Sequence, residues 1–207
     1  AALHSVGASP RGRRVALRFA RRVEAPVTVD VFQQSIGRRI TEPRLVARFR
    51  NRTRPFTWNG RSNRPGRRVR NGYLFVRYAL RLPDGSRPSR RVTLRRARGR
   101  FTRGPDFHRP DTCGLLESFK MRAPVFGGRT RRPLTLGFRV RERATVGIVV
   151  LRGRRVVHRF REGERAGGRL FRVGLRARGL RRGLYRVRIT ARRGGEVARV
   201  TLAARKL

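Results

Sequence analysis

The chain has 207 residues, enough for one large or two small domains, and 56 basic residues against 11 acidic ones give a net charge of +45. The single cysteine, Cys113, excludes an intrachain disulfide, and no run of about 18 apolar residues is present that could span a membrane. Solubility alone requires a much smaller net charge, so we expect the working protein to bind neutralising anions.

Residues 1–12 read as an extended lead-in to the first domain. The chain starts with small residues, which suits a mature protein whose signal peptide has been removed, and a fragment of a longer chain would start in the same way. On the first reading, the protein is extracellular or lies at the cell surface.

Alternating apolar and polar residues predict short strands through the first half of the chain. The most distinctive segment is Phe56-Thr57-Trp58-Asn59-Gly60-Arg61, which contains the only tryptophan. Trp58 alternates in phase with Phe56, so we predict that it lies in a core. The predicted strands lie around residues 15–19, 27–31, 38–40, 45–49, 56–58, 74–82 and 92–94.

The second half repeats this pattern in the same order. Residues 27–31 match 146–150, and the strand that follows Gly72 matches the one that follows Gly183. The other matches are 15–19 with 134–138, 37–40 with 153–156, 56–58 with 171–173, and 92–94 with 200–202. The pattern predicts an all-β chain with two tandem β-sandwich domains, 13–98 and 130–207, joined by a long, irregular, proline-containing connector, 99–129.

The segment Trp58-Asn59-Gly60-Arg61, followed by a glycine loop and Asn71-Gly72-Tyr73, resembles the immunoglobulin-like domain of flagellar hook-capping proteins. Related domains recur in tandem in secreted bacterial proteins. The family pattern is Trp-Asp-Gly, a loop, and Gly-x-Tyr. Here Asn59 replaces the aspartate, and the second copy keeps Gly183-Leu184-Tyr185 but lacks the tryptophan. The resemblance implies immunoglobulin-like sandwiches with a scaffolding or display role outside the cytoplasm, and it implies no enzyme activity.

Arginines occupy the polar faces of several predicted strands. Across a sheet such side chains lie about 5 Å apart, and unpaired like charges at this distance are unfavourable. A bound polyanion would reverse that effect, because arginine makes bidentate contacts to phosphate, sulfate and carboxylate groups. A solvated face screened by salt is the alternative. The predicted polyanion-binding residues are Arg44, Arg48, Arg50, Arg77, Arg81, Arg159, Arg161, Arg186, Arg188 and Arg192.

One cluster in the connector, formed by Asp106, His108, Asp111 and Cys113, contains residue types that could support catalysis or bind a metal. A zinc site needs about four ligands, ideally several cysteines or histidines, and no phosphate-binding glycine motif occurs in the chain. The alternatives are that the acids pair with arginines and that Cys113 forms an intermolecular disulfide. We predict no catalytic residues, no metal and no cofactor.

The sequence therefore predicts a non-catalytic, exported structural protein that binds an anionic partner, such as an acidic protein or a cell-surface polymer. Self-assembly into a filament or addition of a strand at a sheet edge would fit such a protein. The alternative is a protein that coats nucleic acid. Its binding would be non-specific, because no recognition helix or RNA-binding signature is present.

Overall fold

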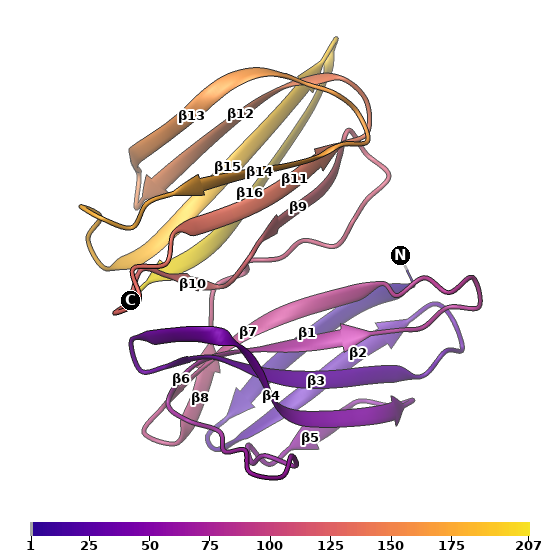
Figure 1. Cartoon of the computed structure of the whole chain (residues 1–207). Helices are drawn as coiled ribbons and strands as arrows, with labels where there is room; N and C mark the ends of the chain where they lie inside the picture. Colours follow the sequence, from indigo (N-terminus) through magenta and orange to yellow (C-terminus); the bar gives the residue numbers. More distant parts are fainter. Residues whose placement is uncertain (1) are drawn as a thin grey trace. The chain divides into compact units, whose positions relative to one another are not determined.

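The computed structural model describes residues 2–207, and this range contains sixteen β-strands and no helix (Figure 1). The predicted all-β class is confirmed. No helix able to cross a membrane is found within the described range. The chain divides into two compact units, Ala1–Gly104 and Pro105–Leu207.

The first unit consists of two antiparallel sheets (Figure 1). The smaller sheet has the order β1-β2-β5, with strands Leu3–Arg11, Arg14–Arg21 and Phe56–Trp58. The larger sheet has the order β4-β3-β6-β7-β8, with strands Arg39–Arg52, Val27–Ile36, Gly72–Ala79, Ser89–Ala97 and Arg100–Arg103.

Side chains from both sheets of the first unit form one hydrophobic core. Leu17 and Trp58 come from the smaller sheet, and Val29 and Val76 come from the larger one. Trp58 is 2% exposed, as its alternation with Phe56 predicts, and its ring centroid lies 5.3 Å from that of Phe101. Because two sheets bury their apolar faces against each other, the unit is sandwich-like.

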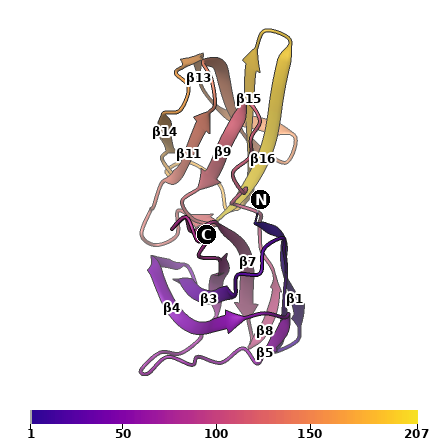
Figure 2. The ribbon, with the colours of Figure 1, turned by 90° about the vertical axis from the view of Figure 1, so that its right-hand side faces the viewer.

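The second unit is built in a similar way. Its smaller sheet has the order β14-β11-β9, with strands Leu170–Leu175, Leu134–Val140 and Leu116–Met121. Its larger sheet has the order β10-β16-β15-β12-β13, with strands Val125–Phe126, Glu196–Lys206, Gly183–Arg193, Ala144–Arg152 and Arg155–Arg165. Figure 2 shows β15 and β16 as a long yellow hairpin.

The order of the strands agrees with the duplication predicted from the sequence. The smaller sheets β1-β2-β5 and β9-β11-β14 correspond, as do β4-β3-β6-β7 and β13-β12-β15-β16 in the larger sheets. The fifth strands differ, because β8 follows β7 and is antiparallel to it, whereas β10 precedes β11 and is parallel to β16. The repeat therefore covers seven strands of each unit and leaves one edge of the larger sheet to a different segment.

The structure shifts the predicted match between residues 92–94 and 200–202 by two positions. Val92 pairs with Val76, and Leu202 pairs with Val187, the residue that corresponds to Val76. Val92 therefore corresponds to Leu202, two positions away from the predicted Val200. Strict alternation looks the same after a shift of two residues, so the sequence pattern alone cannot fix this register.

The predicted match between residues 15–19 and 134–138 is shifted in the same way. Leu17 pairs with Phe56, and Phe138 pairs with Phe171, the predicted counterpart of Phe56. If Phe56 corresponds to Phe171, Leu17 corresponds to Phe138 and not to the predicted Leu136.

Two segments differ from the predicted boundaries. The proposed lead-in, 1–12, contains β1, which buries Leu3 and Ala8 in the core of the first unit. The proposed connector, 99–129, contains β8, β9 and β10, and the division between the units falls within it. Burial along β1 does not alternate strictly, so the pattern that reveals a strand is weak there.

Candidate anion-binding surfaces

The outer face of the larger sheet in the first unit, opposite the core, holds a carboxylate between two arginines. Asp30 on β3 pairs across the ladder with Arg48 on β4 and with Arg77 on β6. Arg48 donates from Nε and Nη2 to the two carboxylate oxygens at 2.7 and 3.1 Å, and Arg77 Nη2 donates at 2.6 Å. The Asp30 side chain is 1% exposed, so these contacts satisfy a buried charge.

The same contacts control the protonation of the group. Burial alone would raise the pKa of the Asp30 carboxyl, but the hydrogen bonds and charges of Arg48 and Arg77 outweigh it, and the pKa is lowered. The hydrogen bond to Asp30 raises the pKa of Arg48. Arg48 and Arg77, both predicted to bind an external anion, therefore have a counter-ion within the chain.

The equivalent face of the second unit has an apolar residue at the central position. Val149 on β12 pairs with Arg159 on β13 and with Arg188 on β15. Both arginines are exposed, and Val149 is half-buried. Within residues 2–207, no carboxylate forms an ion pair with Arg159 or Arg188.

The remaining predicted arginines of the second unit lie near this row. Arg186 is exposed on the same face, two residues before Arg188 on β15. Arg192 Nη1 lies 3.4 Å from Glu162 Oε1, so this arginine has an acidic partner. Arg161 lies where the register of the β12–β13 ladder shifts. The structure thus brings Arg159, Arg186 and Arg188 together on one exposed face.

The remaining predicted arginines of the first unit do not form one surface. Arg44 pairs with Gln33, on the side of the sheet opposite Arg48, because a shift in register falls between them. Arg50 is exposed next to another such irregularity, and Arg81 lies beyond the end of β6. The predicted ladder of arginines across neighbouring strands therefore does not form in this unit, because a bulge turns Arg44 to the other side of the sheet and Arg81 lies outside the strand.

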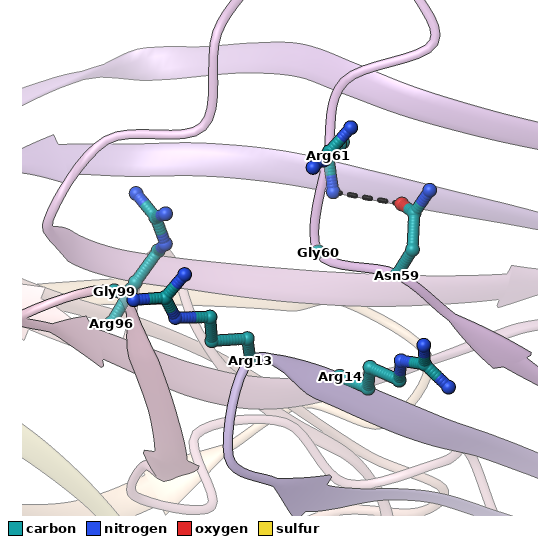
Figure 3. A pocket seen from close by; sticks show the side chains of 7 residues that line it. All are labelled: Arg13, Arg14, Asn59, Gly60, Arg61, Arg96 and Gly99. Carbon is teal, nitrogen blue, oxygen red and sulfur yellow. Dashed lines mark hydrogen bonds between the residues drawn. The ribbon is translucent and has the colours of Figure 1, made fainter.

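The first unit also contains an arginine-lined hollow of about 690 Å³ that the sequence pattern did not predict (Figure 3). It forms where the β1–β2 turn lies beside the start of β8, since Phe101 N donates to Gly12 O at 2.8 Å. The lining residues are Arg13, Arg14, Asn59, Gly60, Arg61, Arg96 and Gly99.

Two of these arginines lie close together in the hollow. The position that a Cβ atom would take at Gly99 is 3.9 Å from both Arg13 Nε and Arg96 Nη2, and Figure 3 shows these two side chains side by side. Arg96 Nη1 donates to Val69 O at 2.8 Å, while Arg14 points away from Arg13. No carboxylate of the described chain pairs with Arg13 or Arg96, so the hollow is suited to an oxyanion.

The Trp58 motif shapes this hollow. Trp58 Nε1 donates to Arg61 O at 2.8 Å, and Arg61 N donates to Asn59 Oδ1 at 2.9 Å. Gly60 has a φ of +77°, and a Cβ atom there would lie 2.4 Å from Arg13 O. Glycine is therefore required at residue 60 for the backbone there to lie this close to the carbonyl of Arg13. The Trp-Asn-Gly-Arg motif was the available signal, but its neighbours come from the β1–β2 turn, β7 and the β7–β8 turn, and the local pattern does not show that these segments lie beside it.

The segment that contains Cys113 holds a free thiol and an ion pair. Cys113 is a free, exposed thiol, and its carbonyl accepts a hydrogen bond from Arg141 Nη1 at 2.5 Å. Lys120 Nζ lies 2.7 Å from Asp111 Oδ1, so this acid has a basic partner within the segment, a lysine instead of one of the arginines that the alternative interpretation named. Among residues 2–207, no three His, Cys, Asp or Glu side chains are grouped so that they could hold a metal ion.

Comparisons with known proteins identify no relative from which a role could be transferred. A scan against protein-family models found no match, and a search of curated proteins found no significant match. The candidate surfaces are therefore defined by their geometry and charge.

Proposed function

We propose that this is a non-catalytic, exported structural protein whose exposed arginine surfaces bind an anionic partner. The observation that carries the proposal is the outer face of the second unit, where Arg159, Arg186 and Arg188 are exposed without a carboxylate partner in residues 2–207. Like charges on neighbouring strands repel each other, and a bound anion converts that repulsion into attraction.

We infer that both units are immunoglobulin-like domains. Each pairs a three-stranded sheet with a larger one in a shared strand order. In the second unit, the Tyr185 hydroxyl donates to Arg181 O, four residues upstream, at 2.7 Å. Immunoglobulin sandwiches have a similar tyrosine corner at the start of the equivalent strand. This feature supports the resemblance to the hook-capping domains, and with it a scaffolding role outside the cytoplasm.

Binding of the full chain to labelled poly-glutamate, heparin and DNA at physiological salt tests the proposal. We expect saturable binding that the triple variant Arg159→Gln, Arg186→Gln, Arg188→Gln weakens by about tenfold or more, since each charged contact contributes about 1.5–3 kcal/mol. The control variant Arg172→Gln, Arg176→Gln, Arg178→Gln loses the same charge elsewhere in the second unit. An equal effect of both variants, or a wild-type chain that stays monomeric at low salt and binds none of the three polymers, would contradict the proposal.

A role in coating nucleic acid is the competing proposal, and the same titrations distinguish it. It requires DNA binding that grows with DNA length, survives physiological salt and outcompetes the other polyanions. Displacement of DNA by heparin at equal charge would count against it. Binding at low salt does not discriminate, because a chain of charge +45 binds any polyanion there.

A further inference from the structure

The two larger sheets repeat each other closely enough to compare individual positions. In the first unit Val31 pairs with Val76, and in the second Val150 pairs with Val187. One residue before each central-strand valine, the side chain points to the outer face. That outer position is occupied by Asp30 in the first unit and by a valine in the second.

The neighbours of this position are the same in both units. Asp30 lies between Arg48 and Arg77 in the first unit. Val149 lies between Arg159 and Arg188 in the second. The second unit therefore keeps both cations of the row but lacks the acid that neutralises them in the first.

We propose that the pair formed by Arg159 and Arg188 binds a carboxylate of an acidic polypeptide. This carboxylate lies above Val149 and neutralises the two arginines, as Asp30 neutralises Arg48 and Arg77 in the first unit. This assignment rests on the proposed function and specifies its ligand. The carboxylate is the anion that the chain itself uses between the corresponding arginines, with a bidentate contact to one and a single contact to the other.

The spacing of the arginines along β15 favours an extended peptide as the source of the carboxylate. Arg186 and Arg188 are two residues apart on one strand, so their Cα atoms are separated by about 6.8 Å. Acidic residues at alternate positions of an extended peptide repeat at the same distance. Such a peptide can therefore place one carboxylate at the row of Val149 and the next at Arg186.

The experiment introduces an acidic residue at position 149, which corresponds to Asp30 in the first unit. Val149→Asp gives the second unit its own carboxylate between Arg159 and Arg188, which competes intramolecularly with an incoming one. We measure fluorescence anisotropy of a labelled peptide with alternating glutamate and threonine, added to the full chain at physiological salt. We expect Val149→Asp to weaken binding by about tenfold or more.

Two controls separate this effect from charge and packing. Val149→Asn has the same shape as the aspartate without its charge, and Leu170→Asp adds the same charge at an exposed position of the smaller sheet. Both should bind the peptide within about threefold of wild type, a difference of less than 1 kcal/mol. If Val149→Asp misfolds, the pair Arg159→Gln, Arg188→Gln replaces it, with Arg176→Gln, Arg178→Gln as its charge-matched control.

The outcomes distinguish the two proposals. If wild type binds the peptide and Val149→Asp binds it as well as Val149→Asn does, the row of Val149 is not the site, and the broader function stands. If heparin or polyphosphate competes better than the peptide at equal charge and is equally sensitive to Val149→Asp, the site exists but its ligand is not a carboxylate. If wild type binds none of these polymers, both proposals fail.

Discussion

Asp30 neutralises Arg48 and Arg77, whose side chains are 27% and 33% exposed. Asp30→Asn removes the charge and leaves two partly buried guanidinium groups without a counter-ion. We expect the first unit to lose about 2–4 kcal/mol of unfolding free energy, because breaking a buried pair leaves an uncompensated charge. Urea denaturation measures this loss. Glu24→Gln, at an exposed acid, is the control and should change stability by less than about 0.5 kcal/mol.

The effect of Asp30→Asn should also depend on pH. The pKa of Asp30 is lower in the folded protein than in the unfolded chain, where aspartate titrates near about 3.9. The unfolded chain therefore binds more protons in the acid range, and the contribution of Asp30 is lost as the pH falls below about 4. The difference in unfolding free energy between wild type and Asp30→Asn should be largest at pH 6 and should decrease towards pH 2. A difference that persists unchanged at pH 2 would show that the ion pair is not its cause.

At the scale of elements, Gly72 and Gly183 begin the equivalent strands β6 and β15, with φ angles of 142° and 135°. A Cβ atom at Gly72 would lie 2.1 Å from Ser35 O, whereas at Gly183 the nearest atom is in the Arg152 side chain at 3.6 Å. We expect Gly183→Ala to cost about 1–2 kcal/mol for backbone strain alone, and Gly72→Ala to cost about 3 kcal/mol or more. Calorimetry of the two variants compares the losses, and equal losses would contradict the predicted clash.

The same two glycines show what the sequence could reveal about the elements. Gly72 and Gly183 each precede an alternating strand, so the repeat and the core position of Trp58 were predictable from local pattern. The ion pairs of Asp30 were not, because they depend on register across three strands, and bulges shift that register. The hollow beside Trp58 was missed because its residues come from the β1–β2 turn, the Trp58 loop, β7 and the β7–β8 turn, which only long-range pairing brings together.

At the scale of the whole molecule, the charge exceeds what the chain can neutralise. With 11 acids against 56 bases, the isolated protein keeps a charge of +45 even if every acid is paired. The larger sheet of the second unit is an example, because Arg159 and Arg188 flank Val149 where Arg48 and Arg77 flank Asp30 in the first unit. The compact state therefore contains unrelieved repulsion that a bound anion would reduce.

That repulsion predicts a stability that depends on salt. The screening length falls from about 30 Å at 0.01 M salt to about 10 Å at 0.1 M, so the melting temperature should rise over this range. At 0.01 M salt, micromolar poly-glutamate should raise it as well, because a ligand that binds the folded state stabilises it. The triple variant Arg159→Gln, Arg186→Gln, Arg188→Gln should melt higher than wild type at low salt and gain less from either addition. Scanning calorimetry measures these shifts. A melting temperature that neither salt nor poly-glutamate changes would show that repulsion between the arginines does not destabilise the folded protein.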